Sequence, residues 1–299
     1  MSSKVGTPDA IIFVHSVRKA GGRVRITAQL IDTTNGAHLW ADRFDGSLED
    51  VFDLQDQVAL SVAGVIEPTL QAAEIRRSFD RPTADLTAYD LYLRALAPIR
   101  SASGEKERYV QGLETLRRAI ARDPGYGLAL ALAGHCHLAL DAAGWTNDVA
   151  ANQREGVELA RRALTAAGDD PGVLANVAYV LAYFGEDIAA AMTLIDRSLE
   201  LNPSFALAWA RSAWLRLWAG QPDVAIEHFG TSMRLNPRDR RAEPLLGIGV
   251  GHFFDERFDP AEAALLLSLE EMTWVPTYRF LASCRAHMGR LDEAREIGR

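Results

Sequence analysis

The residues of this chain that come closest to a metal site are His135, Cys136 and His137, which follow one another directly. Imidazole and thiolate groups are the ligands that zinc prefers, and a structural zinc site takes four of them. Residues one and two apart on a helix point in different directions, so this triplet needs ligands from elsewhere to close on one ion. The sequence therefore predicts no metal site and no cofactor.

A second chemical pattern is Gly247-Ile248-Gly249-Val250-Gly251, whose glycine spacing imitates a phosphate-binding loop. It follows no strand pattern and lacks the Lys-Ser/Thr pair of a nucleotide loop, so close packing between helices explains it better. The sequence also has no Gly-x-Ser-x-Gly motif and no carboxylate pair in a setting that tunes it for acid and base catalysis. We therefore predict no catalytic residues and no enzymatic activity.

The elements that must carry these residues repeat along the chain. Leu201-Asn202-Pro203 recurs 34 positions later as Leu235-Asn236-Pro237, and each copy closes a segment with the pattern of a two-helix hairpin. A fixed period of this size is typical of a helical repeat array, whose units bury their apolar faces against one another. The fixed positions of the unit 204–237 are Trp209, Ala213, Gly220, Ala225, Phe229, Ser232 and Pro237.

The unit 204–237 can be interpreted position by position. The small Ala213, four residues after Trp209, lets a neighbouring helix approach closely. Gly220 supplies a left-handed cap, after which a second helix starts around Asp223. Ala225 and Phe229, one turn apart, form the inward face of that helix. Matching positions elsewhere are Leu174, Ala178, Gly185, Ala191, Ile195, Ser198 and Pro203, then Leu245, Gly249, Ala261, Leu265 and Ser268, and last Tyr278, Ala282, Gly289 and Ala294.

This series of Trp or Leu, small residue, Ala, Phe and Pro resembles the tetratricopeptide repeat, from roughly residue 85 to residue 299. The resemblance implies a mainly α fold. We expect a TPR-type α-solenoid of about five to six helical hairpins over residues 81–299, preceded by a small α+β segment over residues 1–80. The fit is looser upstream, where residues 89–99 pair with 109–121 and the next two helices are joined by a long connection at 144–147.

In the tetratricopeptide family, the first helix of each hairpin lines a concave groove through the residue after the small packing residue and the residue one turn later. The corresponding residues here are His135 and Ala139, Tyr179 and Tyr183, Trp214 and Trp218, Val250 and Phe254, and Ser283 and His287. We expect the groove to bind a partner through its large rings, which are Tyr179, Tyr183, Trp214, Trp218 and Phe254. Such rings suit an apolar partner helix or an extended peptide. The sequence leaves one alternative open, in which these rings pack between adjacent helices or are covered by another part of the chain.

The first eighty residues show a different pattern. Residues 11–18 and 23–32 alternate with a period of two on either side of Gly21-Gly22, which predicts a β-hairpin. Asn35-Gly36 signals a second turn, and residues 37–44 a third strand. Ser47 can cap a helix that follows. The apolar face of that helix comprises Val51, Leu54, Val58, Val62 and Val65.

Residues 16–32, with Gly36-Ala37-His38-Leu39-Trp40-Ala41 and Leu54-Gln55-Asp56, resemble the end of the TolB-like amino-terminal domain. In many bacterial proteins this domain precedes tetratricopeptide repeats and lies behind a class III adenylate/guanylate cyclase domain or a winged-helix domain. The family's domain has further strands and helices before residue 10, which implies a short family member or a fragment with an open sheet edge. We expect strand 11–17 to pair with a second copy or to be covered by the nearby helix.

Composition and charge limit the remaining alternatives. The net charge of −8 argues against broad nucleic-acid affinity, although Arg18, Lys19, Arg23 and Arg25 cluster on the hairpin. No run of eighteen apolar residues and no signal-peptide core are found, which predicts a cytoplasmic protein without membrane contact. The two cysteines lie far apart, which predicts reduced core residues rather than a disulfide.

Two function classes are consistent with these observations. The first is a non-enzymatic scaffold in bacterial signalling that binds a protein or peptide, or self-associates through strand 11–17 or the C-terminal repeat end. At that end we expect Tyr278, Leu281 and Leu291 to lack full cover. The second is the regulatory or assembly portion of an adenylate cyclase-type protein whose catalytic domain this chain does not contain.

Overall fold

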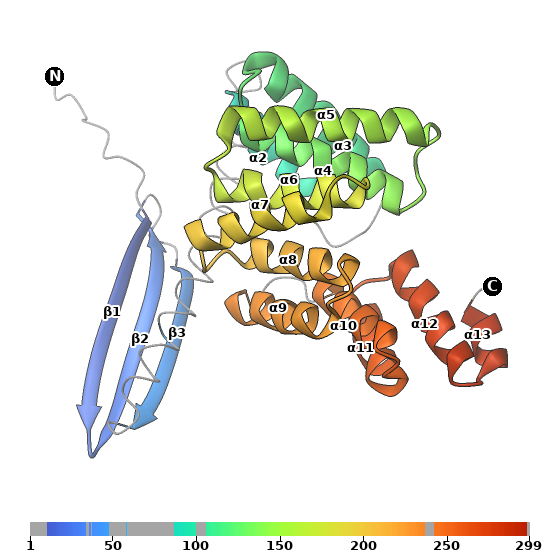
Figure 1. Cartoon of the computed structure of the whole chain (residues 1–299). Coiled ribbons are helices and arrows are strands. Elements are labelled where there is room, and N and C mark those ends of the chain that lie inside the picture. The colour runs from blue at the N-terminus through green and yellow to red at the C-terminus, as the bar shows by residue number, and fades with distance from the viewer. Residues whose placement is uncertain are drawn as a thin grey trace. The chain divides into compact units, whose positions relative to one another are not determined.

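The computed structural model describes residues 11–33, 36, 38–47, 58, 87–99, 106–236 and 242–297. The chain divides into two compact units, Met1–Glu74 and Ile75–Arg299. The first unit contributes a small sheet and the second an array of helices (Figure 1).

The sheet of the first unit has three antiparallel strands in the order β1 (Ile11–Ala20), β2 (Arg23–Asp32) and β3 (His38–Ser47). Gly21 and Gly22 connect β1 to β2 with φ angles of 55° and 77°, the left-handed conformation that a two-residue hairpin turn needs at both positions. The predicted hairpin is therefore confirmed. The third strand runs to Ser47 rather than ending at residue 44. Apart from Val58, the helix expected after it lies outside the described residues.

The two faces and edges of this sheet differ in burial. Val24, Ala28 and Leu30 of β2 share one face with Trp40 of β3, and all four are buried. Strand β1 is an edge strand within the described residues, and its Phe13, Val14 and Val17 are exposed. An edge strand with exposed apolar side chains is a template for pairing with another strand.

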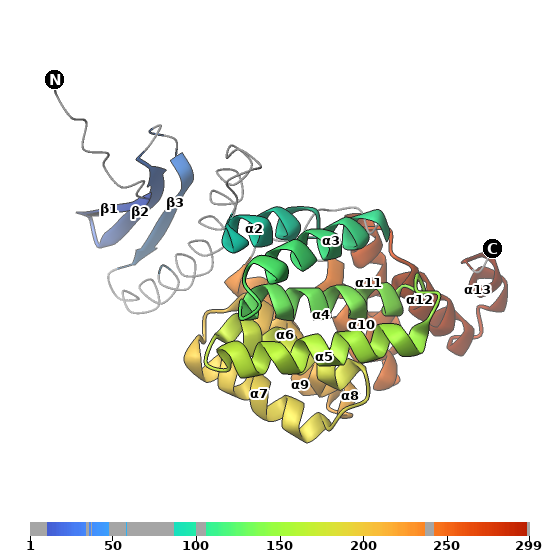
Figure 2. The same cartoon turned by 90° about the horizontal axis from the view of Figure 1, so that it is seen from above.

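The second unit consists of consecutive helical hairpins, which follow one another from α2 to α13 (Figures 1 and 2). The first helices of the hairpins are α2 (Ala88–Ile99), α4 (Gly127–Ala142), α6 (Pro171–Tyr183), α8 (Ala206–Trp218), α10 (Ala242–Phe254) and α12 (Val275–His287). The second helices are α3 (Lys106–Arg122), α5 (Val149–Ala167), α7 (Ile188–Leu201), α9 (Pro222–Leu235), α11 (Phe258–Glu271) and α13 (Leu291–Ile297). The predicted mainly α solenoid is confirmed.

The turns inside the hairpins explain the glycines of the repeat. Gly144, Gly185, Gly220 and Gly289 have φ angles of 71°, 81°, 74° and 79°, a left-handed conformation that glycine adopts without steric cost. In the turn between α10 and α11 the sequence lacks this glycine, and Glu256 takes the conformation instead with a φ of 55°. This turn therefore keeps the backbone conformation of the other turns, although that conformation is unfavourable for a residue with a side chain.

Three of the second helices, α7, α9 and α11, are each tied to the start of their own first helix by a serine. Ser198 donates a hydrogen bond to the Pro171 carbonyl at 2.7 Å. Ser232 donates in the same way to Ala206, and Ser268 to Ala242, both at 2.8 Å. These serines are the fixed positions that the sequence repeat identified. Their buried hydroxyl groups are satisfied by hydrogen bonds, so each contributes about 1 kcal/mol rather than the cost of an unpaired polar group.

The glycines of the imitated phosphate loop lie inside α10, where they make room for α9 and α11. A Cβ atom on Gly247 would overlap the Phe229 ring, and one on Gly249 would lie 2.7 Å from Leu265 Cγ. Gly251 faces Ile226, with 2.9 Å between its ideal Cβ and Ile226 Cγ1. Close helix packing therefore accounts for this motif, as the sequence indicated.

The buried side chains of the helical unit form two clusters. One extends from α2 to α8, and the other from α8 to α12. Trp214 packs against both of them. Leu281 belongs to the second cluster and is 3% exposed, so the expectation that it lacks cover is wrong. Tyr278 and Leu291, in contrast, are exposed at this end.

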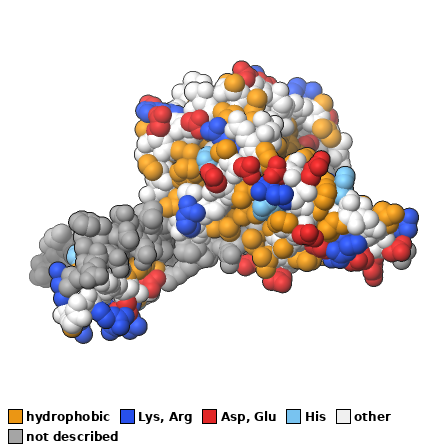
Figure 3. All heavy atoms as spheres, turned by 60° about the horizontal axis from the view of Figure 1, so that its bottom comes forward, with side chains coloured by type: hydrophobic (Ala, Val, Ile, Leu, Met, Phe, Trp, Pro, Cys, Tyr) orange, Lys and Arg blue, Asp and Glu red, His pale blue; other side chains and the backbone are white. Residues whose placement is uncertain are grey.

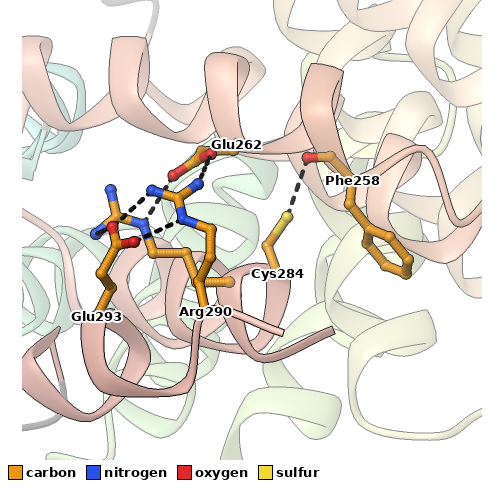
Figure 4. Close-up of polar contacts among 6 residues, drawn as sticks. Phe258, Glu262, Cys284, Arg290 and Glu293 are labelled. Atoms are coloured by element: carbon orange, nitrogen blue, oxygen red, sulfur yellow. Dashed lines mark hydrogen bonds and ion pairs between the residues drawn. The ribbon is translucent and has the colours of Figure 1, made fainter. Parts of the chain in front are cut away.

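Ion pairs hold the last hairpin to α11 (Figure 4). Glu262 of α11 accepts hydrogen bonds from Arg285 Nε at 2.7 Å and from Arg290 Nη1 at 2.6 Å. Arg290 also binds Glu293 of α13 through two of its nitrogens. Nearby, the Cys284 thiol donates to the Phe258 carbonyl at 3.1 Å. A charged network of this kind fixes α13, which buries no residue of its own.

We predict that Gly247→Ala lowers the free energy of unfolding by about 1–3 kcal/mol, because the Phe229 ring must move within a close-packed core. Gly230→Ala on the neighbouring helix α9 is the control. Its nearest neighbour is the flexible end of Arg234 at 3.6 Å, so the alanine gains up to about 1 kcal/mol of helix propensity. Thermal unfolding followed by circular dichroism compares the two. Equal melting temperatures for Gly247→Ala and the wild type would contradict this packing.

We predict that Glu256→Gly stabilises the protein by about 0.5–1 kcal/mol. The left-handed conformation costs an L-residue about 1–2 kcal/mol, of which the extra chain entropy of glycine in the unfolded state cancels a part. The reciprocal change, Gly220→Ala, should destabilise the equivalent turn by a similar amount. Melting temperatures that move in the same direction for both variants would show that the backbone conformation is not the cause.

Candidate functional site

Four of the five predicted groove residues lie together on α6 and α8. Tyr179 and Trp218 stack with ring centroids 5.3 Å apart and an angle of 10° between the planes. Tyr183 lies 6.0 Å and Trp214 6.3 Å from Trp218, measured between ring centroids. These residues lie one turn apart on each helix, and α6 packs against α8 in the array. Helical spacing within each helix and packing between the two helices together produce the cluster.

The other side of Tyr179 faces a buried arginine. The guanidinium carbon of Arg211, on α8, lies 4.0 Å from the centre of the Tyr179 ring. Arg211 is 5% exposed, so its charge is removed from water and requires compensation. The cation–π contact supplies part of it, since a cation over an aromatic face is stabilised most when desolvated. Arg211, Tyr179 and Trp218 therefore form three consecutive layers.

Glu243, in the first turn of α10, supplies the compensating charge. Its Oε1 atom accepts hydrogen bonds from Arg211 Nη1 at 3.0 Å and from Trp214 Nε1 at 3.1 Å. His135 of α4 completes the arginine's surroundings, with Nε2 3.3 Å from Arg211 Nη2. Burial, and secondly the charge of Arg211, hold the pKa of His135 well below its ordinary value of 6.5. The ring is therefore neutral at pH 7, and its Nε2 accepts the arginine's hydrogen bond.

A second carboxylate contacts the cluster from α4. The Tyr183 hydroxyl donates to Asp141 Oδ2 at 3.0 Å. Burial and this carboxylate raise the pKa of Tyr183, so the hydroxyl stays protonated and continues to donate. Each side of the aromatic cluster therefore ends in a carboxylate, Glu243 beside Trp214 and Asp141 beside Tyr183.

The rings differ in how much surface they offer. Tyr179 is 7% exposed and packs between helices, which is the alternative that the sequence left open for all of these rings. Tyr183 and Trp214 are half-buried, whereas Trp218 is 40% exposed. Trp218 is therefore the ring of this cluster with the most surface for a partner. Figure 3 shows one face of the helical unit, where apolar patches alternate with acidic and basic side chains.

The fifth predicted residue belongs to another cluster. Phe254, at the end of α10, is 62% exposed and lies against Phe253 and Phe280, with centroids 5.7 Å and 6.1 Å away. No ring contact joins it to Trp218 among the described residues. Val250, which the pattern also placed on the groove, is buried in the second core cluster. The aromatic surface thus consists of two separate patches.

Sequence reasoning missed Arg211 and Glu243. One signal in the sequence pointed to Arg211, because it is a charged residue among the apolar and small residues that α8 buries. The pairing itself joins α8 to α10, across two hairpins. A repeat period identifies equivalent positions but not contacts between unlike positions of neighbouring units.

The His135-Cys136-His137 triplet diverges, as helical geometry requires. His135 points to Arg211, Cys136 is buried and free, and the His137 ring bonds Asn152 Oδ1 at 2.8 Å. Cys284 is also free and buried, as expected of both cysteines. Within the part of the chain that the structure describes, no group of three or more His, Cys, Asp or Glu residues is placed to hold a metal ion.

A depression of about 780 Å³ lies along α5, away from the aromatic cluster. Its charged lining includes Arg161 and Glu186, which pair with each other at 2.7 Å. Surface pairs of this kind contribute about 0–1 kcal/mol and show no preorganised site for a charged ligand. The aromatic cluster is therefore the better candidate. Over the described ranges, no helix has the length and apolar character needed to cross a membrane.

Comparison with known proteins places the fold. No protein-family model matches the chain. It is 34% identical over 156 residues to the putative adenylate cyclase 3 of Rhizobium meliloti (strain 1021), a match that covers 52% of this chain and 26% of the relative. The chain thus spans about a quarter of the length of that curated relative.

Solved structures resemble the helical unit at low sequence identity. PilW, a widely conserved type IV pilus biogenesis factor, aligns with a TM-score of 0.50 at 15% identity, covering 70% of this chain and 90% of PilW. The human IFIT1 dimer with PPP-AAAA aligns with a TM-score of 0.59 at 16% identity, covering 71% of this chain and 49% of that protein. Likeness at this identity concerns the fold alone. Together with the hairpin geometry, it identifies the helical unit as a tetratricopeptide-type α-solenoid.

Proposed function

We propose that this chain is a non-enzymatic scaffold in bacterial signalling, which binds a partner peptide or helix on its aromatic surface. The surface consists of Tyr183, Trp214, Trp218 and Phe254, and the buried Tyr179 supports it by stacking on Trp218. The observation that carries the proposal is the exposure of Trp218 and Phe254, two large rings on first helices of an array. Exposed aromatic residues beside polar groups are typical anchors of protein interfaces.

The polar groups of the cluster support binding rather than catalysis. Arg211, Glu243 and Trp214 are bonded to one another, and the Tyr183 hydroxyl is bonded to Asp141. These contacts hold the rings in place before a partner arrives. Preorganised side chains lose little rotamer entropy on binding, which favours affinity. We place this scaffold in the cytoplasm.

A second function is favoured by the match to the putative adenylate cyclase 3 of Rhizobium meliloti. The chain corresponds to a quarter of that relative, so it can act as the regulatory or assembly portion of a cyclase-type protein. The TolB-like resemblance of residues 16–56 agrees with this function. In such a protein the array would bind a partner, and a separate domain would form the cyclic nucleotide.

Self-association is a further part of the proposal. Phe13, Val14 and Val17 on the edge strand β1 suit pairing with a second copy, and Tyr278 and Leu291 expose apolar surface at the other end. Sedimentation over a range of concentrations, with Val14→Lys to block the strand and Leu291→Lys to block the repeat end, separates the two surfaces.

We predict that Trp218→Ala and Phe254→Ala together reduce recovery of the partner by tenfold or more. Truncation of a central aromatic anchor typically costs 2 kcal/mol or more of binding free energy. The partner is first identified by cross-linking to the wild-type chain, and its recovery is then compared between variants. Leu267→Ala, which removes an exposed side chain of α11, is the control and should leave recovery unchanged. Equal recovery by the double variant would contradict the proposed surface.

We predict that the purified chain forms no cyclic AMP or cyclic GMP from the corresponding nucleotide triphosphates. Among the described residues, no group of three or more His, Cys, Asp or Glu residues is placed to hold a catalytic metal ion. Product is measured by chromatography in the presence of Mg²⁺ or Mn²⁺, with an active cyclase as positive control. Turnover that copurifies with the chain would refute the scaffold and show an enzyme.

A further inference from the structure

The inference that follows rests on the proposed function and specifies the chemistry of the partner. Its starting point is the exposed ring of Trp218. Tyr179 stacks on one face of this ring, which remains 40% exposed. Tyr183 and Trp214 flank it at angles of 59° and 32°. An exposed indole flanked by tilted rings is an arrangement in which an aromatic site can hold a cation.

Two carboxylates of the cluster give this surface a negative charge. Asp141 and Glu243 are each separated from Trp218 by a single ring, Tyr183 and Trp214 respectively. The Glu243 side chain is 34% exposed, although it accepts two hydrogen bonds, so it still has surface for a third donor. Asp141 lies in the last turn of α4, where the negative end of the helix dipole disfavours a carboxylate. A cation near Asp141 would relieve that repulsion.

The positive charge of Arg211 does not neutralise the negative charge at the surface. Arg211 is buried beneath Tyr179 and already bonded to Glu243. His135 is neutral because its pKa is held far below 6.5. With Arg211 positive and both carboxylates negative, these four groups carry a net charge of −1. The negative charges lie nearer to solvent than the positive one.

We propose that the Trp218 surface binds a lysine or arginine side chain of a basic partner peptide. The cation lies against the exposed part of the Trp218 ring and is attracted by Asp141 on one side of the cluster and by Glu243 on the other. The aliphatic stem of the same side chain covers Tyr183 and Trp214, as long basic side chains do on apolar surfaces. An acidic partner would place a carboxylate against two others and bury it against rings whose faces are negative.

The test uses three synthetic peptides of equal length and equal apolar spacing, which carry lysine, glutamine or glutamate at their polar positions. Binding to the full chain is measured by isothermal titration calorimetry and by the indole N–H resonance of Trp218, assigned through its loss in Trp218→Leu. We expect the lysine peptide to bind at least tenfold more tightly than the glutamate peptide. We also expect this preference to weaken as salt increases.

Single variants then show which side chains produce the preference for the lysine peptide. Trp218→Leu keeps an apolar side chain but removes the ring, and should weaken binding of the lysine peptide by about 3- to 30-fold. Asp141→Asn and Glu243→Gln should each weaken it by about 3-fold or more, with less effect on the glutamine peptide. Glu158→Gln, which removes an exposed carboxylate on α5 along the other depression, is the control and should have no effect. Melting temperatures check that each variant is folded.

Three outcomes overturn the inference. One is a glutamate peptide that binds as tightly as the lysine peptide, and another is a lysine peptide whose affinity is unchanged by Trp218→Leu and Asp141→Asn. The third is the absence of binding by all three peptides at millimolar concentration. The proposed function fails separately, when the cross-linked natural partner is recovered equally by the Trp218→Ala, Phe254→Ala variant. If that variant no longer recovers the natural partner, but the partner binds through acidic residues, only the proposal of a cationic ligand is refuted.

Discussion

The close approach of the two helices in each hairpin is the constraint on which the helical unit depends. A Cβ atom on Gly134 would lie 3.2 Å from the Gly156 carbonyl of the facing helix, and one on Gly249 would lie 3.2 Å from the Ala261 carbonyl. Ala178 and Ala213, at the equivalent positions, are fully buried. Small residues there bring the backbones together, so larger side chains must occupy the neighbouring faces. The aromatic residues directly after Ala178 and Ala213 consequently lie on the side that faces the next hairpin.

The candidate site lies where the core of the array divides. Trp214 packs against both clusters, and Glu243 joins α10 to α8 through Arg211 and Trp214. Apolar packing holds each cluster together, whereas hydrogen bonds of a buried ion pair contribute to the junction. Removal of Glu243 leaves the buried Arg211 without its carboxylate partner, which is destabilising. The same residues that position the rings therefore also couple the two halves of the array.

Much of the fold could be predicted from the sequence because the repeat is encoded in local, periodic features. Glycine turns, small packing residues and the serines of the second helices each recur at fixed places, and the structure assigns a contact to each. The contacts of Arg211 and Glu243 could not be predicted, since they depend on how one hairpin is rotated against the next. Phe254 occupies the position equivalent to Trp218 but packs with Phe253 of its own helix and Phe280 of the following hairpin, whereas Trp218 packs with Tyr179 and Tyr183 of the preceding hairpin. Leu281 is buried by α11 despite its place in the last unit.

The buried arginine also restrains the aromatic residues around it. A guanidinium removed from water must keep its partners, so Arg211 restrains Tyr179 through the cation–π contact and Glu243 through a hydrogen bond. Tyr179 in turn supports Trp218 by stacking, and Glu243 fixes the Trp214 indole. A single buried charge thereby orients an exposed ring two layers away. The hydrogen bond to Glu243 and the cation–π contact with Tyr179 compensate the burial of Arg211, and the same two contacts restrain the rings around it.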